Sequence, residues 1–147
     1  MAQRLVADSS VALKWWLDDE QFVDEARLIL TKVVAKDLEL MVPELWLYEI
    51  TNGINIAVKR DRITKELGQE FIEELQSIKI TQIPIISYLQ TIYEEAQIYR
   101  YAVYDISYMV IAEIENIPLI TGDEKFFNTV KGNKSFVKYL SDLERIF

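Results

Sequence analysis

Short apolar runs alternate with longer segments of helical periodicity along the whole chain. Apolar runs that stop at a polar residue or a proline predict strands at residues 4–7, 39–42, 79–83 and 118–121, with an edge strand at 135–138. Apolar positions at helical spacing predict helices at residues 11–17, 22–35, 44–59, 64–77, 88–101 and 105–115, and a short helical segment near Phe126. Strands separated by helices predict an α/β fold, with a central, mostly parallel sheet of four to five strands and helices on both faces.

The length and composition fit a single globular domain. The 147 residues are 50% hydrophobic and 27% charged, and only four Gly and three Pro interrupt them. We see no linker or internal repeat, and therefore expect one domain over residues 1–147. The sequence has neither a long apolar segment nor a basic N-terminal region followed by an apolar one. We expect a soluble, cytoplasmic protein.

The absence of Cys and His restricts the possible chemistry. The chain contains neither residue type, so thiol nucleophiles, catalytic imidazoles and the usual zinc and copper ligands are excluded. Any bound metal must be a hard cation that is held by oxygen. The net charge of −8 argues against a broad basic surface for nucleic acid.

Two acidic residues stand out from their local pattern. Asp8 directly follows the first predicted strand, where it either caps the next helix or lies at the strand end where α/β proteins bind ligands. Glu49 interrupts a helical stripe that also contains Leu45, Asn52 and Ile56. Because an unpaired buried carboxylate is costly, either this stripe lies at the edge of the core or Glu49 meets a cation. Asn52, one turn further on, is placed to support the carboxylate.

Two further acids have adequate structural explanations when taken alone. Asp105 opens a predicted helix, where the helix dipole favours a negative charge. Asp123 follows the fourth strand and Gly122, as a turn residue would. Together with Asp8 and Glu49, however, these positions can converge on one edge of the sheet.

Four converging carboxylates would repel one another strongly. No Lys or Arg is placed to neutralise them, so divalent cations are the simplest remedy, and Mg²⁺ or Mn²⁺ suits such oxygen ligands. A pair of these ions can activate water and stabilise the leaving oxygen of a phosphodiester. Scattered cations are candidates for guiding a nucleic-acid strand, although ordinary solubilising surface explains most of them: Lys14, Lys59, Arg60, Arg62, Lys125, Lys131, Lys134 and Lys138.

Four segments in order resemble the motifs of PIN-domain ribonucleases, and most closely those of the VapC toxins of prokaryotic toxin–antitoxin pairs. The segments are VADSSVALKWW at residues 6–16, PEL and EITN at 43–45 and 49–52, YDISY at 104–108, and PLITGDE at 118–124. Each motif is weak alone, but the four in register cover nearly the whole chain. The resemblance implies a PIN-like fold and assigns Asp8, Glu49, Asp105 and Asp123 to the catalytic, metal-binding positions. It places Ser9 or Ser10 and Thr121 at small hydroxyl positions near the site.

The same resemblance implies an activity and partners. PIN-domain toxins of this kind are Mg²⁺- or Mn²⁺-dependent endoribonucleases that form homodimers and are inhibited by a small VapB-type antitoxin. Two alternatives remain open from the residues. One is a PIN-fold binding module that cuts nothing. The other is a receiver-like signalling domain, which would need adjacent acids after the first strand and an Asp after the third.

Overall fold

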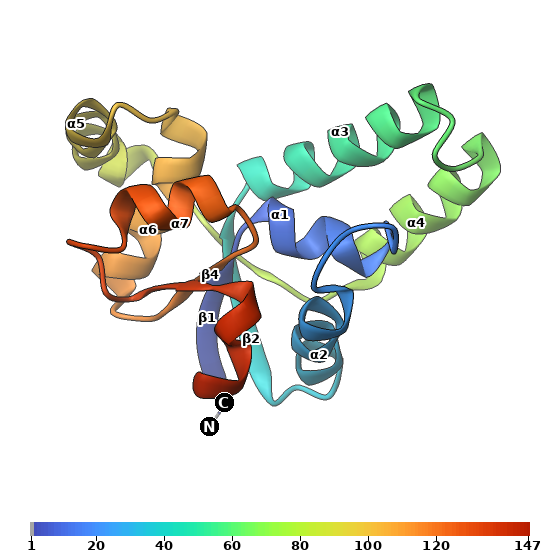
Figure 1. Ribbon diagram of the computed structural model, residues 1–147, viewed down its shortest axis with the longest axis horizontal. Coiled ribbons are helices and arrows are strands. Elements are labelled where there is room, and N and C mark those ends of the chain that lie inside the picture. Colours follow the sequence, from blue (N-terminus) through green and yellow to red (C-terminus); the bar gives the residue numbers. More distant parts are fainter. Residues whose placement is uncertain (1) are drawn as a thin grey trace.

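The computed structural model describes residues 2–147, and a five-stranded sheet lies at its centre (Figure 1). All neighbouring strands are parallel, in the order β3-β2-β1-β4-β5. The strands are β1 (Gln3–Ala7), β2 (Leu38–Pro43), β3 (Thr81–Ile83), β4 (Leu119–Thr121) and β5 (Val137–Tyr139). The expected α/β class, parallel sheet and strand number are confirmed.

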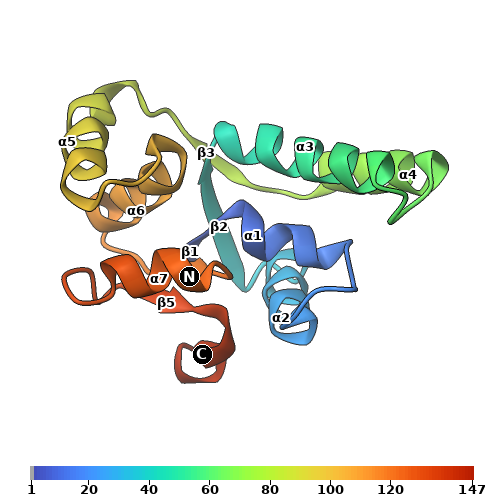
Figure 2. The same cartoon turned by 45° about the horizontal axis from the view of Figure 1, so that its top comes forward.

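Helices cover both faces of the sheet (Figure 1). Helix α6 packs on β1, β2 and β4 from one side, while α2 packs on β2 from the other. Helices α3 and α4 lie side by side as a hairpin that extends away from the sheet (Figure 2). The helices are α1 (Ser9–Ala12), α2 (Val23–Val34), α3 (Leu45–Lys59), α4 (Lys65–Ser77), α5 (Leu89–Tyr99), α6 (Val103–Glu115) and α7 (Glu124–Val130). Three 3₁₀ helices join them: η1 (Leu13–Trp15), η2 (Ile86–Tyr88) and η3 (Leu140–Arg145).

The centre of the sheet is covered on both faces, and its strands are accordingly apolar. Leu5, Val6 and Ala7 of β1 have no exposed surface, and neither have Leu119 and Ile120 of β4. This continuous burial is what a parallel strand with helices on both faces requires. Among residues 2–147, none of the helices is long and apolar enough to cross a membrane.

The largest departures from the predicted elements lie at the two ends of the chain. The helix expected at residues 11–17 is instead one α-helical turn, α1, followed by the tighter η1. This tightening brings the bulky Trp15 and Trp16 into the core, where Trp15 donates its indole N–H to the carbonyl of Ala26 at 2.8 Å. The edge strand lies two residues later than expected, and η3 was not expected at all. Local sequence patterns are weakest for such short elements.

The strand order brings the ends of β1 and β4 together. Ala7 pairs with Ile120 in the parallel ladder, so Asp8 and Thr121 follow side by side. The chain leaves β1 toward β2 on one side, and β4 leads to β5 on the other. The point where strand order reverses is where open α/β sheets bind ligands. Receiver domains have the order 2-1-3-4-5, so the observed order argues against the signalling alternative.

The buried sheet makes a direct stability prediction. Leu40 of β2 is 1% exposed, whereas Leu28 of α2 is 42% exposed. We expect Leu40→Ala to lower the free energy of unfolding by about 2–5 kcal/mol, because it removes buried methyl groups and leaves a cavity. The same change at Leu28 should cost no more than about 0.5 kcal/mol. Urea unfolding of both variants measures the difference, and equal costs would contradict the described core.

Candidate active site at the carboxyl edge of the sheet

Asp8 is the most deeply buried acid of the candidate site, with 7% of its surface exposed. It caps α1 by accepting the backbone N–H of Ser10 at 3.1 Å, as the structural explanation of Asp8 required. Burial is the main reason that its pKa rises from 3.8 to about 6, although hydrogen bonds from Ser10 and Thr121 oppose the rise. The negative charge of Asp123 raises this pKa further. Asp8 is thus a cap, and also a buried carboxylate near a second acid.

Ser10 connects Asp8 to the loop after β4. Its hydroxyl donates to the Asp8 carboxylate and accepts the backbone N–H of Gly122 at 2.8 Å. A Cβ on Gly122 would lie only 3.2 Å from this hydroxyl and 3.0 Å from Cε of Lys14. Glycine is therefore the residue that allows the two loops to approach so closely.

Glu49 is held by a residue that the sequence analysis did not single out. The hydroxyl of Tyr108, on α6, donates to Oε1 of Glu49 at 2.5 Å. Burial, and then the hydrogen bond to Glu49 and the charge of Glu49, raise the pKa of Tyr108 well above its ordinary value, while a hydrogen bond with Ser9 opposes the rise. Tyr108 therefore stays protonated and links α1, α3 and α6. The only sequence signal was its place one turn after Asp105.

The α3 stripe lies beside the core and not within it. The face of α3 that enters the core carries Trp46, Ile50, Ile54 and Ala57, whereas Glu49 is partly buried and Asn52 is exposed. The stripe thus lies at the edge of the core, where the charge of Glu49 is still close enough to act on Asp105. Both polar side chains line a cavity of about 420 Å³ together with Leu45, Tyr48 and Tyr104.

The pKa of Asp105 is raised by burial and by the charges of all three other acids. Asp105 lies in the first turn of α6, which begins two residues earlier than predicted. Burial raises its pKa from 3.8 to about 6, and the charges of Asp8, Glu49 and Asp123 raise it further. The fold therefore brings the four predicted acids close enough for their charges to interact.

Asp123 and Thr121 complete the edge. Asp123 accepts the backbone N–H of Phe126 at 3.1 Å and so caps α7. Thr121 is fully buried and accepts the N–H of Asp123 at 3.1 Å, while its hydroxyl also bonds to Asp8. The small hydroxyl residues named from the sequence thus lie between the acids.

The four acids have no cationic partner among residues 2–147, since none of the ion pairs there includes Asp8, Glu49, Asp105 or Asp123. Within the same residues, no three acidic side chains stand close enough to grip one ion as they lie. The donor set is nevertheless entirely oxygen, partly desolvated and mutually repulsive. Such a set fits a hard divalent cation, provided that the side chains rotate inward to share it.

Lys14 is not the surface cation that the sequence suggested. It is 7% exposed, its side chain packs beside Gly122, and its amine lies 3.3 Å from the carboxylate of Glu20. Glu20 in turn pairs with Arg62 in the α3–α4 connection. Lys14 therefore connects the loop at Gly122, through Glu20 and Arg62, to the hairpin of α3 and α4.

Comparison with known proteins decides the family. The PIN-domain family model matches residues 5–132. The VapC ribonuclease Mb0985 of Mycobacterium bovis and the ribonuclease VapC9 of Mycobacterium tuberculosis are each 30% identical to this chain over 125 residues, which is 85% of this chain and 90% of theirs. The chain belongs to the PIN-domain family, among the VapC proteins.

A solved structure agrees on the fold of this PIN-domain protein. The crystal structure of PAE2754 from Pyrobaculum aerophilum superposes with a TM-score of 0.66 and covers 99% of this chain and 98% of that one. At 20% sequence identity, this likeness supports the arrangement of the elements and nothing finer.

The buried acids make the stability of this PIN-domain protein depend on pH. Because Asp8 and Asp105 have raised pKa values in the folded state, the folded protein holds protons that the unfolded chain releases. The free energy of unfolding should therefore fall as the pH rises from about 4 to about 6, and then level off. For Asp8, a rise from 3.8 to about 6 corresponds to at most about 3 kcal/mol.

In EDTA at pH 8, Asp8→Asn should therefore be more stable than the wild type, because Asn still caps α1 without a charge. The advantage should vanish at pH 4. Thermal or urea unfolding measures it, with Asp18→Asn at an exposed position as the control. A loss of stability at pH 8 would contradict the account.

Proposed function

We propose that this protein is a divalent-metal-dependent endoribonuclease that acts in the cytoplasm as the toxin of a toxin–antitoxin pair. The observation that carries the proposal is the group of four interacting carboxylates at the point of reversed strand order. The PIN-domain match and the ribonuclease relatives support the same activity. RNA is the proposed substrate, and hydrolysis of a phosphodiester is the proposed reaction.

Asp8, Glu49, Asp105 and Asp123 are the proposed ligands of Mg²⁺ or Mn²⁺. When bound, such ions would lower the pKa of water and stabilise the charge that develops on the phosphodiester oxygens. The raised pKa values of Asp8 and Asp105 support this assignment, because they show that burial and neighbouring charges disfavour the ionised carboxylates. A bound cation would stabilise these ionised forms.

The neighbouring side chains serve the acids by orienting them. Ser10 and Thr121 hydrogen-bond to Asp8 and so restrict the rotation of its carboxylate. Tyr108, with Ser9 beside it, holds one oxygen of Glu49 and leaves the other available. Asn52 lines the cavity beside Glu49, where its amide is placed to bond to a nucleotide. Such supporting residues position ligands of metal sites in general.

A homodimer is the proposed assembly, and an exposed apolar surface supports it. Ile86, Leu89 and Tyr93 follow one another at helical spacing on η2 and α5, and all are exposed. Tyr48 lies near them, since it shares one cleft with Ile85, and it shares another with Tyr104. An apolar surface of this kind marks an interaction site. A second copy on it would stand next to Glu49.

A small VapB-type antitoxin is the other proposed partner. An inhibitor of such a site needs to block the acids or displace the cations, and a cationic side chain pairs well with a carboxylate cluster. The exposed mouth of the site beside Tyr48 and Tyr104 gives an inhibitory segment room to enter.

The nuclease proposal predicts metal-dependent cleavage of RNA. Purified protein with labelled RNA should cut in Mn²⁺ and not in EDTA. Asp8→Asn and Asp105→Asn should each reduce the rate by about 100-fold or more, since losing about 3 kcal/mol of transition-state stabilisation has that effect. Asp18→Asn, at an exposed position, should cut normally. Intact RNA with the wild type in Mn²⁺ would favour the silent binding module instead.

The dimer proposal predicts that a charge on the apolar surface separates the copies. Ile86→Glu places a carboxylate at a residue that is 79% exposed, while Ile98→Glu does so at one that is 69% exposed on another face of α5. We expect a monomer for Ile86→Glu and a dimer for Ile98→Glu, because burying an unpaired charge is costly. Sedimentation velocity measures both, and an unchanged mass for Ile86→Glu would contradict this interface.

A further inference from the structure

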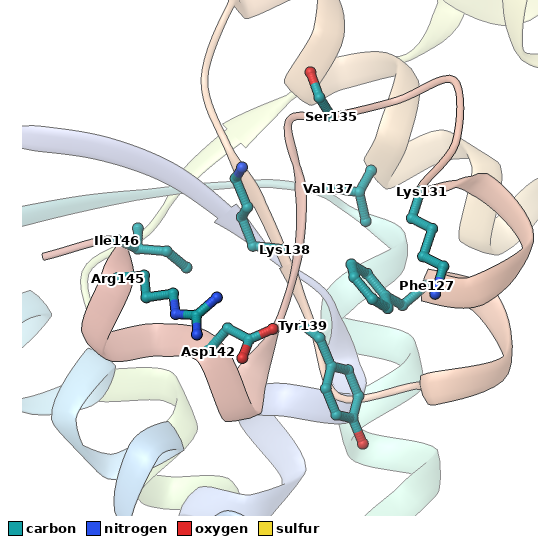
Figure 3. Close-up of a pocket in the computed structure, with 9 residues that line it drawn as sticks. All are labelled: Phe127, Lys131, Ser135, Val137, Lys138, Tyr139, Asp142, Arg145 and Ile146. Atoms are coloured by element: carbon teal, nitrogen blue, oxygen red, sulfur yellow. The ribbon is translucent and has the colours of Figure 1, made fainter.

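A cavity of about 340 Å³ lies along β5, the edge strand of the sheet (Figure 3). Phe127 of α7 and Lys131, which follows this helix, form one wall, and Asp142, Arg145 and Ile146 at η3 form the other. Ser135, Val137, Lys138 and Tyr139 lie between these walls. The volume is within the range of about 300–1,000 Å³ that holds small ligands.

The cavity is basic in a protein of net charge −8. Lys131, Lys138 and Arg145 line it together with a single acid, Asp142. Within residues 2–147 none of these three cations forms an ion pair, whereas Arg4, Lys14, Arg62 and Lys134 all do. Three cations around one opening repel one another, so an anion that entered it would be attracted.

Aromatic rings stand beside these charges. Phe127 and Tyr139 are 5.6 Å apart between ring centroids, with a tilt of 31°, and the edge-on ring of Phe22 lies 5.7 Å from Tyr139. The amine of Lys131 lies 5.6 Å from the Phe127 ring. Cations combined with aromatic rings are the features with which proteins hold single-stranded nucleic acid, one for the phosphate and the other for the base.

The cavity adjoins the carboxylate site. Tyr139 pairs in register with Thr121 at the end of β4, and burial, followed by the charges of Glu124 and Asp123, raises the pKa of its phenol. Tyr139 therefore lines the cavity and also lies close enough to Asp123 for that charge to act on it. A strand that crosses the acids can continue past Tyr139 into the cavity.

We propose that this cavity is a subsite for one nucleotide of the RNA strand next to the cleaved bond. Lys131, Lys138 and Arg145 bind its phosphate, and Phe127 and Tyr139 contact its base. This inference rests on the proposed ribonuclease function, and it names residues on α7, β5 and η3 that hold the substrate away from the metal-binding acids.

The test compares two double variants with the same change in charge. Lys131→Gln/Lys138→Gln alters the cavity, whereas Lys65→Gln/Lys79→Gln alters exposed lysines that do not line it. The first assay is cleavage of a fluorescein-labelled single-stranded RNA 12-mer in Mn²⁺. The cavity variant should raise KM by about 10-fold with kcat nearly unchanged, since its lysines bind the phosphate uniformly through the reaction. The control variant should match the wild type.

The second assay is binding of the same RNA in EDTA, over a range of NaCl concentrations. The slope of log Kd against log salt should decrease by about 1.4 in the cavity variant, about 0.7 for each lost phosphate contact. Lys131→Arg/Lys138→Arg should restore both KM and the slope, which a merely structural role would not require.

Each outcome bears on one proposal. Equal KM values and equal salt slopes for the two Gln variants overturn the subsite, even when the wild type cleaves RNA. Absence of cleavage by the wild type overturns the ribonuclease function instead. Weaker binding of the cavity variant in EDTA would then still support a nucleotide site on β5.

Discussion

Like charges gathered at one edge of a parallel sheet are the constraint on which this site depends. The ladder between β1 and β4 and the capping of α1 hold Asp8 in place, so its backbone stays beside its neighbours. Asp123 caps α7 and Asp105 lies in the first turn of α6, so these two helices fix the backbone positions of both acids. The backbone thus imposes a repulsion that solvent only partly screens, because Asp8 is buried and Asp105 is partly buried. The proposed cations would convert this cost into binding affinity.

The repulsive centre and the cationic cavity together answer the objection raised by the net charge. A protein of charge −8 does not attract RNA over its whole surface. Here the negative charge includes the acids that metal ions would neutralise, while unpaired cations gather beside β5. The binding of RNA depends on the local charge along the proposed path of the RNA strand, and not on the net charge of the protein.

Much of the fold and part of the site followed from the sequence. Runs that end at Asp8 and near Asp123 marked the ends of parallel strands, and such ends meet at one edge by geometry alone. The roles of Tyr108 and Lys14 could not be predicted in the same way. Tyr108 reads as an ordinary apolar position on a buried helix, and only the crossing of α3 and α6 brings it to Glu49. Lys14 reads as a surface charge until the tight η1 turn buries it beside Gly122.

The most direct test of the central claim is the melting temperature with and without Mn²⁺ at pH 8. If the acids form a cation site, Mn²⁺ should raise the melting temperature of the wild type in proportion to its binding. In a double variant that combines Asp8→Asn with Asp105→Asn, the repulsion is relieved without metal, so Mn²⁺ should cause little or no shift. An unchanged melting temperature for the wild type, or an equal shift in both proteins, would contradict the account.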